Sequence, residues 1–206
     1  MTKMIFKFFT ICFLTLIVKS AFSQEIAIYG SILENGNVSS CNWYFKQNQA
    51  CMELIFSDEN KSKVTTRLLM NSETNILKIW TLKNGSTSCF SISADSIKPI
   101  NSNLVKFIQT TYFKEFDSFG NCSKTQGRNL TSEYLIYTFE NENINLNKFK
   151  SFIKNDVIFE FLSNTISNKF PVQAITTTSS GELIRSYLAE KFTKEIPDNI
   201  FNSSCE

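Results

Sequence analysis

The sequence contains no histidine. Without histidine, the chain cannot form a Ser-His-Asp or Cys-His catalytic set, and it cannot hold zinc or haem through imidazole ligands. A catalytic base would have to be Glu, Asp, Lys or Tyr, and a nucleophile would need unusual activation. The commonest catalytic designs are therefore excluded. We expect no metal and no cofactor, and an enzyme is the less favoured reading.

Arginine is scarce as well. The three arginines, Arg67, Arg128 and Arg185, are scattered along a chain that has 21 basic and 19 acidic residues. Nucleic-acid binding requires a clustered basic face that displaces counterions from phosphates, and contact with an anionic membrane surface requires a polybasic patch. The sequence therefore predicts no nucleic-acid partner and no electrostatic membrane contact.

Proline and glycine are few, with three and six residues, and no segment is rich in Pro, Gly or Ser. A hydrophobic content of 42% is enough to build a core, so a disordered or low-complexity chain is excluded. Twenty residues are phenylalanine, which predicts a Phe-rich core before it predicts an aromatic binding site.

The first 23 residues have the layout of a secretory signal peptide. Two lysines lie within the first seven residues, residues 8–18 form an apolar run, and Ala21 and Ser23 occupy the −3 and −1 positions of a cleavage site. The apolar run is too short to span a bilayer. We predict cleavage after Ser23 and a secreted or periplasmic protein with no membrane span. Residues 24–206 then form a single exported domain.

Five cysteines would remain after cleavage: Cys41, Cys51, Cys89, Cys122 and Cys205. In an exported protein they are disulfide candidates first, and an odd number leaves at least one without a partner in the chain. Two bridges among five cysteines can be drawn in fifteen ways, because each of five choices for the odd one leaves three pairings. The sequence does not choose among them.

The segment 41–51, CNWYFKQNQAC, brackets aromatic residues with two of these cysteines. A two-residue turn at Gln47-Asn48 predicts three pairs on one apolar face: Cys41 with Leu54, Trp43 with Met52, and Phe45 with Ala50. Cys41 and Cys51 then lie on opposite faces, where no bridge can join them. We favour this hairpin, with Cys51 facing outward. The alternative is a loop closed by a Cys41–Cys51 disulfide, which would stabilise by roughly 3 kcal/mol.

The first half of the chain reads as antiparallel sheet. Short strand patterns cover 25–33, 52–57 and 64–70, and Asn84-Gly85 lies between two β-rich runs as in a two-residue hairpin. That hairpin places Trp80 opposite Cys89 and Lys78 opposite Ser91.

The second half reads differently. Apolar spacing favours a helix over 102–117, with a long strand as the alternative, and a polar loop follows around Gly120 and Gly127. The remaining predicted elements are a strand at 134–140, a helix from Leu146 to about Lys169, a strand opened by Pro171, and a final helix after Ser179. We therefore predict an α+β fold: an N-terminal antiparallel sheet of hairpins, then a strand-helix-strand-helix half.

The segment 176–182, TTTSSGE, is the sharpest candidate site. A strand would run through Ser179, Ser180 and Gly181 into a helix N-terminus, where free N–H groups favour an anion. An ordinary helix cap explains the same residues without a ligand. The leading functional hypothesis is a non-enzymatic binding domain for a protein or small-ligand partner. The alternative is a small histidine-free hydrolase that uses Ser or Glu chemistry near this turn.

Overall fold

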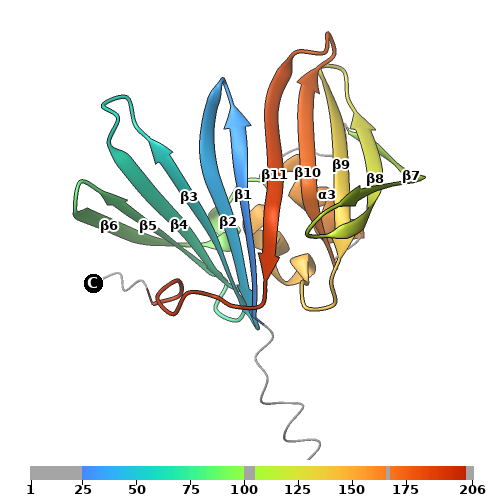
Figure 1. Ribbon diagram of the computed structural model, residues 1–206. Helices are drawn as coiled ribbons and strands as arrows, with labels where there is room; N and C mark the ends of the chain where they lie inside the picture. Colours follow the sequence, from blue (N-terminus) through green and yellow to red (C-terminus); the bar gives the residue numbers. More distant parts are fainter. Residues whose placement is uncertain (1–24, 100–104, 166–167, 203–206) are drawn as a thin grey trace, which may run out of the picture.

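The computed structural model describes residues 25–99, 105–165 and 168–202. In this part of the chain, eleven strands form one antiparallel sheet in the order β6-β5-β4-β3-β2-β1-β11-β10-β9-β8-β7 (Figure 1). The chain runs outward by hairpins from β1 to β6, resumes at the other edge with β7, and returns to the centre. The first strand and the last strand are therefore neighbours in the middle of the sheet.

The strand bounds are β1 (Glu25–Glu34), β2 (Asn37–Lys46), β3 (Gln49–Ser57), β4 (Lys63–Asn71), β5 (Ile76–Lys83), β6 (Ser86–Ser93), β7 (Lys106–Phe116), β8 (Gly120–Arg128), β9 (Ser132–Glu140), β10 (Lys169–Thr178) and β11 (Leu183–Thr193). The helical segments are η1 (Ala94–Ser96), η3 (Leu146–Phe149), α2 (Lys150–Ile153) and α3 (Val157–Thr165). The fold is predominantly β, so the predicted α+β class with a strand-helix-strand-helix half is wrong.

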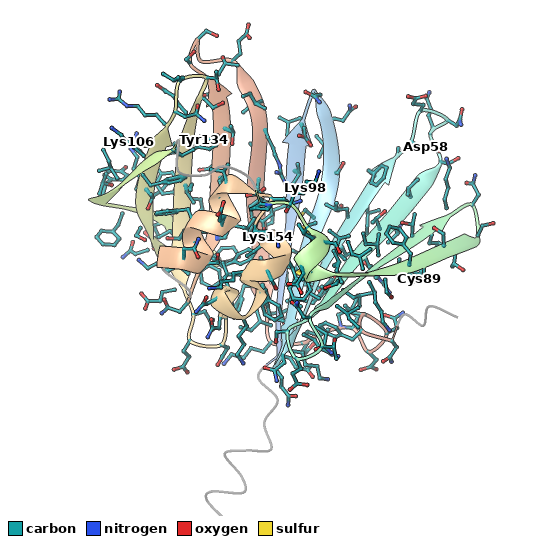
Figure 2. The ribbon with its side chains drawn as sticks, turned by 180° about the vertical axis from the view of Figure 1, so that it is seen from behind. Asp58, Cys89, Lys98, Lys106, Tyr134 and Lys154 are labelled. Atoms are coloured by element: carbon teal, nitrogen blue, oxygen red, sulfur yellow. The ribbon has the colours of Figure 1, made fainter. Side chains whose placement is uncertain are left out.

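The helices cover one face of the sheet, which we call the helical face (Figures 1 and 2). Its core is rich in phenylalanine, as the composition predicted. The Phe170 ring lies 5.6 Å from Trp43 and 5.8 Å from Phe159 of α3. At such distances, edge-on and tilted rings contribute beyond the apolar area that they bury. The aromatic side chains of β2 and β10 thus hold α3 against the sheet.

A second, smaller core lies on the opposite face. It contains Ala27, Tyr44, Cys51, Leu69 and Ile200, with Phe201 packed against them. The C-terminal residues after β11 therefore cover part of this face, and strands β1 to β4 bury side chains on both sides.

A polar network borders this second core. The carboxylate of Glu53 accepts hydrogen bonds from Asn42 Nδ2 (3.3 Å) and Tyr44 OH (3.2 Å), and Arg67 Nε donates to it at 2.8 Å. Arg67 also donates to the Asn199 carbonyl at 3.3 Å. A buried carboxylate is tolerated when it is paired and hydrogen-bonded in this way. The network consequently ties the C-terminal segment to β3 and β4.

Both predicted hairpin registers are confirmed. Phe45 pairs with Ala50, Trp43 with Met52, and Cys41 with Leu54. Trp80 pairs with Cys89, and Lys78 with Ser91. In both hairpins, the residues of the turn and the alternation of apolar and polar residues along the strands favour the same pairing. This agreement fixes the register of an antiparallel pair.

The final predicted helix is strand β11. Its apolar spacing fits a helix, yet Leu183 and Leu188 are exposed while Tyr187 and Ala189 are buried. Because β11 lies between β1 and β10, the sheet satisfies its backbone on both edges, and this overrides the local pattern. Bulges at Tyr29/Gly30 and Thr176/Thr177 in the neighbouring strands also shift the register of its partners.

Two other predictions fail at the β7 edge. The favoured helix over 102–117 is strand β7 in its described part, and the predicted polar loop is strand β8. Cys122 and Thr125 of β8 are buried, although most of its neighbours are polar. The predicted helix from Leu146 is confirmed only in part, because it is divided into η3, α2 and α3. The strands predicted around 134–140 and after Pro171 are present as β9 and β10.

At Gly30 the backbones of β1 and β11 leave no room for a side chain. A Cβ atom at this position would clash with the Leu188 carbonyl oxygen and lie 3.0 Å from the Ala189 Cα. Both are backbone atoms of a strand that is paired on two sides, so neither can move freely. The bulge at the centre of the sheet therefore requires glycine.

We expect Gly30→Ala to lower the free energy of unfolding by about 1–3 kcal/mol, the usual cost of overpacking. Urea denaturation monitored by circular dichroism measures this change. Ser40→Ala on the exposed part of β2 is the control and should change it by less than about 0.5 kcal/mol. An unchanged midpoint for Gly30→Ala would show that β1 and β11 are not this close.

Candidate functional site

A pocket of about 230 Å³ lies between the centre of the sheet and the N-terminal part of α3. Its apolar lining comprises Ile32, Cys41, Trp43, Met52, Val157, Ile158, Phe159, Pro171, Ala174, Ile184 and Tyr187. Its polar lining comprises Glu34, Tyr134, Asn155, Asp156, Thr176 and Arg185. Figure 2 views this face, with the helical segments in front of the strands. An apolar hollow with a few polar groups is the usual form of a small-molecule site.

The register of the three central strands arranges this lining in rows. Ile32, Tyr187 and Ala174 are paired across β1, β11 and β10, and they form an apolar row. Two residues further along, Glu34, Arg185 and Thr176 form a polar row. The sheet floor of the pocket therefore changes from apolar to polar over one step of the strand repeat.

The helical wall is attached to the polar row by Asp156. Its Oδ1 accepts hydrogen bonds from the backbone N–H of Ile158 (3.0 Å) and Phe159 (3.1 Å), which caps the N-terminus of α3. Its Oδ2 lies 3.1 Å from Arg185 Nη1 on β11. The side chain of Arg185 is 38% exposed and that of Asp156 is 27% exposed, so solvent partly screens the ion pair. One carboxylate thus both starts the helix and positions it over the sheet.

Tyr187 lies at the middle of the apolar row. Only 6% of the residue is exposed, and its hydroxyl has no hydrogen-bond partner among the described residues. Burial raises the pKa of Tyr187 well above its ordinary value, and the nearby Cys41 and Glu190 act in the same direction. The hydroxyl therefore keeps its proton at neutral pH.

A larger hollow of about 610 Å³ lies over β7 to β10. Its lining includes the exposed side chains of Lys106, Ile108, Arg128 and Glu133. Strand residues alone line it, whereas the pocket under α3 is lined by residues of both the sheet and the helix. We therefore take the smaller pocket as the candidate site.

The predicted anion site is not at a helix terminus. Ser179, Ser180 and Gly181 form the turn of the β10–β11 hairpin, which is closed by the bond from Thr178 N–H to the Glu182 carbonyl at 2.8 Å. The strand before the turn is also antiparallel to β9, not parallel to it. Since no helix follows, the reason for expecting an anion here is removed, and we do not propose this turn as a site.

The predicted disulfide candidates are dispersed. Cys41, Cys51 and Cys122 are buried free thiols, and Cys41 and Cys51 lie on opposite faces of their hairpin, as predicted. Cys51 does not reach solvent, however, because the second core covers it. Cys89 lies on β6 and is not one of these free thiols, while Cys205 is outside the described residues.

The described residues contain no group of three His, Cys, Asp or Glu side chains placed to hold a metal ion. Over the same residues, none of the helices is both long enough and apolar enough to cross a membrane.

Sequence reasoning missed the residues that define the pocket. Tyr187 falls within the predicted final helix after Ser179, and the sequence shows Arg185 only as a scattered basic residue. Asp156 offered a local signal, since an aspartate directly before an apolar run is typical of an N-cap. No local signal pairs Arg185 with Asp156, because strand pairing brings them together.

No family model and no curated protein matches the sequence. Among solved structures, MucB gives a TM-score of 0.40 at 8% identity, and 89% of this chain aligns with 58% of MucB. A DUF1329 family protein from Desulfovibrio piger gives a TM-score of 0.35 at 11% identity, and 91% of this chain aligns with 93% of that protein. A putative outer membrane lipoprotein-sorting protein domain from Vibrio parahaemolyticus gives a TM-score of 0.35 at 8% identity, and 86% of this chain aligns with 88% of that domain. The chain spans little more than half of MucB. At these identities and TM-scores, the similarity supports no inference about what the chain binds.

The cap on α3 gives one prediction. We expect Asp156→Ala to destabilise the helix by about 1 kcal/mol and to speed amide hydrogen exchange in residues 157–165. Asp156→Asn is the matched variant, because an asparagine oxygen still caps the helix while the ion pair with Arg185 is lost. Asp156→Asn should retain most of the protection of residues 157–165 against amide hydrogen exchange. Equal exchange in Asp156→Ala and the unmutated protein would contradict the capping role.

The thiols give a second prediction. Burial raises the pKa of Cys41 and of Cys51 to about 12, and that of Cys122 to about 11. Relative to an ordinary pKa of about 8.5, a pKa near 12 lowers the reactive thiolate fraction on the order of 1,000-fold. Iodoacetamide at pH 8, followed by mass mapping, should leave all three unlabelled until denaturant is added. Rapid labelling of Cys51 in the folded protein would show that it faces solvent after all.

Proposed function

We propose that the protein is an exported, non-enzymatic binding domain that holds a small, largely apolar molecule between the sheet and α3. The observation that carries the proposal is an apolar hollow lined by both the sheet and α3, with polar groups confined to a few positions. Trp43, Phe159 and Tyr187 supply large apolar surface, and burial of that kind drives the binding of small molecules.

The volume limits the ligand. At 230 Å³ the pocket lies below the roughly 300–1,000 Å³ that is usual for drug-sized ligands. We infer that the occupant is a small molecule, or one short hydrocarbon chain of a larger molecule whose remainder stays outside. The polar row of Glu34, Arg185 and Thr176 would then face the part of the ligand nearer to solvent.

The location is part of the same proposal. The signal-like pattern of residues 1–23 supports export to the periplasm or the medium, with residues 24–206 as one domain. An apolar molecule crossing an aqueous compartment needs a carrier or a receptor that shields it from water. The pocket is suited to that task.

The alternative hydrolase has no observation in its favour. Ser180 Oγ lies 2.7 Å from Thr178 Oγ1, on an exposed turn. Among the described residues, no carboxylate or lysine side chain is hydrogen-bonded or ion-paired to Ser179 or Ser180. A serine nucleophile requires a base within hydrogen-bond reach.

The two tryptophans of the chain provide the test. Trp43 lines the pocket, whereas Trp80 belongs to the second core, beneath Arg67. Bromine quenches tryptophan fluorescence on contact, so 1-bromooctane reports entry into the pocket. In Trp80→Phe, where Trp43 is the remaining tryptophan, we expect saturable quenching.

Two variants serve as controls for this quenching. In Trp43→Phe the emission comes from Trp80 and should show no saturable quenching. Ala174→Phe, combined with Trp80→Phe, fills the pocket and should weaken binding at least tenfold, as expected when an apolar site is blocked. Leu188→Phe introduces the same side chain at an exposed position of β11 and should bind normally. Equal quenching of Trp43 and Trp80 would rule the proposal out.

A further inference from the structure

Tyr187 lines the pocket as part of its apolar row, and its hydroxyl is buried. Its neighbours across the sheet are Ile32 and Ala174, neither of which has a polar side chain. The residue is 6% exposed, and no described residue accepts a hydrogen bond from its hydroxyl. Buried hydroxyls in folded proteins almost always have a partner, so this one requires an explanation.

Packing alone does not provide that explanation. The Tyr187 ring lies 6.3 Å from the Phe170 ring and crosses it nearly at right angles, a contact that phenylalanine would make equally well. Phenylalanine would also avoid the cost of burying a hydroxyl without a partner. The oxygen atom is therefore unnecessary for the core, while it lies in a residue that lines the pocket.

The state of the hydroxyl determines what it can recognise. Burial keeps its pKa well above the ordinary tyrosine value, so at neutral pH it carries a proton that it can donate. A partner in the pocket must then offer an oxygen or another acceptor atom.

The charges of the lining determine which acceptor fits. Glu34 and Asp156 are acidic and Arg185 is basic, which leaves one excess negative charge among the lining residues. The Arg185 guanidinium is already bonded to Asp156 at 3.1 Å. A carboxylate or phosphate would lose its hydration without gaining a free cation, and this is costly in an apolar site. A neutral acceptor avoids that cost.

We propose that the Tyr187 hydroxyl recognises a neutral carbonyl oxygen, of a ketone, ester or amide, carried by a short hydrocarbon ligand in the pocket under α3. This inference rests on the proposed function and deepens it, since it names the chemical class of the ligand. Tyr187 is then a specificity determinant, and the apolar walls supply most of the affinity.

The test compares two ligands of equal shape. 2-Octanone and 2-methyl-1-octene differ only in the replacement of the carbonyl oxygen by a methylene group. Each is used to displace 1-bromooctane from the Trp80→Phe protein, and recovery of Trp43 fluorescence gives its dissociation constant. Comparing the ratio of the two constants between variants removes the difference in how water solvates the two ligands.

In Tyr187→Phe, we expect the preference for 2-octanone over 2-methyl-1-octene to fall roughly fivefold to tenfold, the usual contribution of one neutral hydrogen bond. The affinity for 2-methyl-1-octene should be unchanged or higher. Tyr137→Phe is the matched control, because Tyr137 is 8% exposed but lies outside the pocket lining. The Tyr137→Phe variant should leave the ratio of the two dissociation constants unchanged. Heptanoate, which has a charged head at the same position, should bind at least tenfold more weakly than 2-octanone.

The outcomes separate the two proposals. Saturable quenching with an unchanged ratio in Tyr187→Phe would reject the role of Tyr187 and leave the pocket intact. Tighter binding of heptanoate than of 2-octanone would reject the neutral class. The complete absence of saturable quenching would reject the proposed function, and this inference with it.

A second measurement covers the case in which Tyr187→Phe does not fold. The infrared carbonyl band of carbon-13-labelled 2-octanone is recorded when the ligand is bound to the Trp80→Phe protein. A hydrogen bond from a buried hydroxyl shifts this band below its position in hydrocarbon solvent. A band at the hydrocarbon position would overturn the inference without any change to Tyr187.

Discussion

The pairing of β1 with β11 is the constraint on which the rest of the molecule depends. It joins two runs of antiparallel strands, β1 to β6 and β7 to β11, into one sheet, and it places the first and last of these strands at the centre. The register that it sets aligns Ile32 with Tyr187 and Glu34 with Arg185. The floor of the pocket is therefore built across this junction. It exists only when both runs of strands are in place.

The side chains near the junction explain why a hollow forms here. Elsewhere on the helical face, phenylalanine rings fill much of the space between strands and helices. At the junction, the residue paired with Tyr187 on β10 is Ala174, which lines the pocket and reaches a shorter distance from the sheet. The cap and ion pair of Asp156 fix the end of α3 that lies over the pocket. A small change in the position of this helix end would change the volume beneath it.

The sequence predicted those parts of the fold in which local chemistry and pairing agree. The hairpin at Gln47-Asn48 and the one at Asn84-Gly85 were predicted with their registers, because short turns fix the pairing of the strands next to them. The Phe-rich core followed from composition. In these regions, the information needed lies within about ten residues of chain.

The sequence misled where pairing partners are distant. Strand β11 carries apolar residues at helical spacing, and only its two neighbours in the sheet, β1 and β10, decide that it is extended. The pocket was missed for the same reason, since Tyr187, Arg185 and Asp156 come together only in the assembled sheet and its covering helix. Strand β8 was missed for a different reason: it is too polar to resemble a strand, although its partners β7 and β9 are its neighbours in the chain. The outward orientation predicted for Cys51 failed because nothing in its own hairpin indicates the C-terminal segment that covers it.

The central position of the last strand also constrains how the chain can fold. Strands β1 to β6 can form hairpins as soon as they are available, because all of their contacts with one another are local. The free edge of β1, however, has no partner until β11 arrives, and closing so long a loop is slow compared with forming hairpins. An open strand edge in an incomplete sheet is a template for pairing with another chain. During synthesis, the edge of β1 therefore stays open to pairing with another chain until β11 is complete.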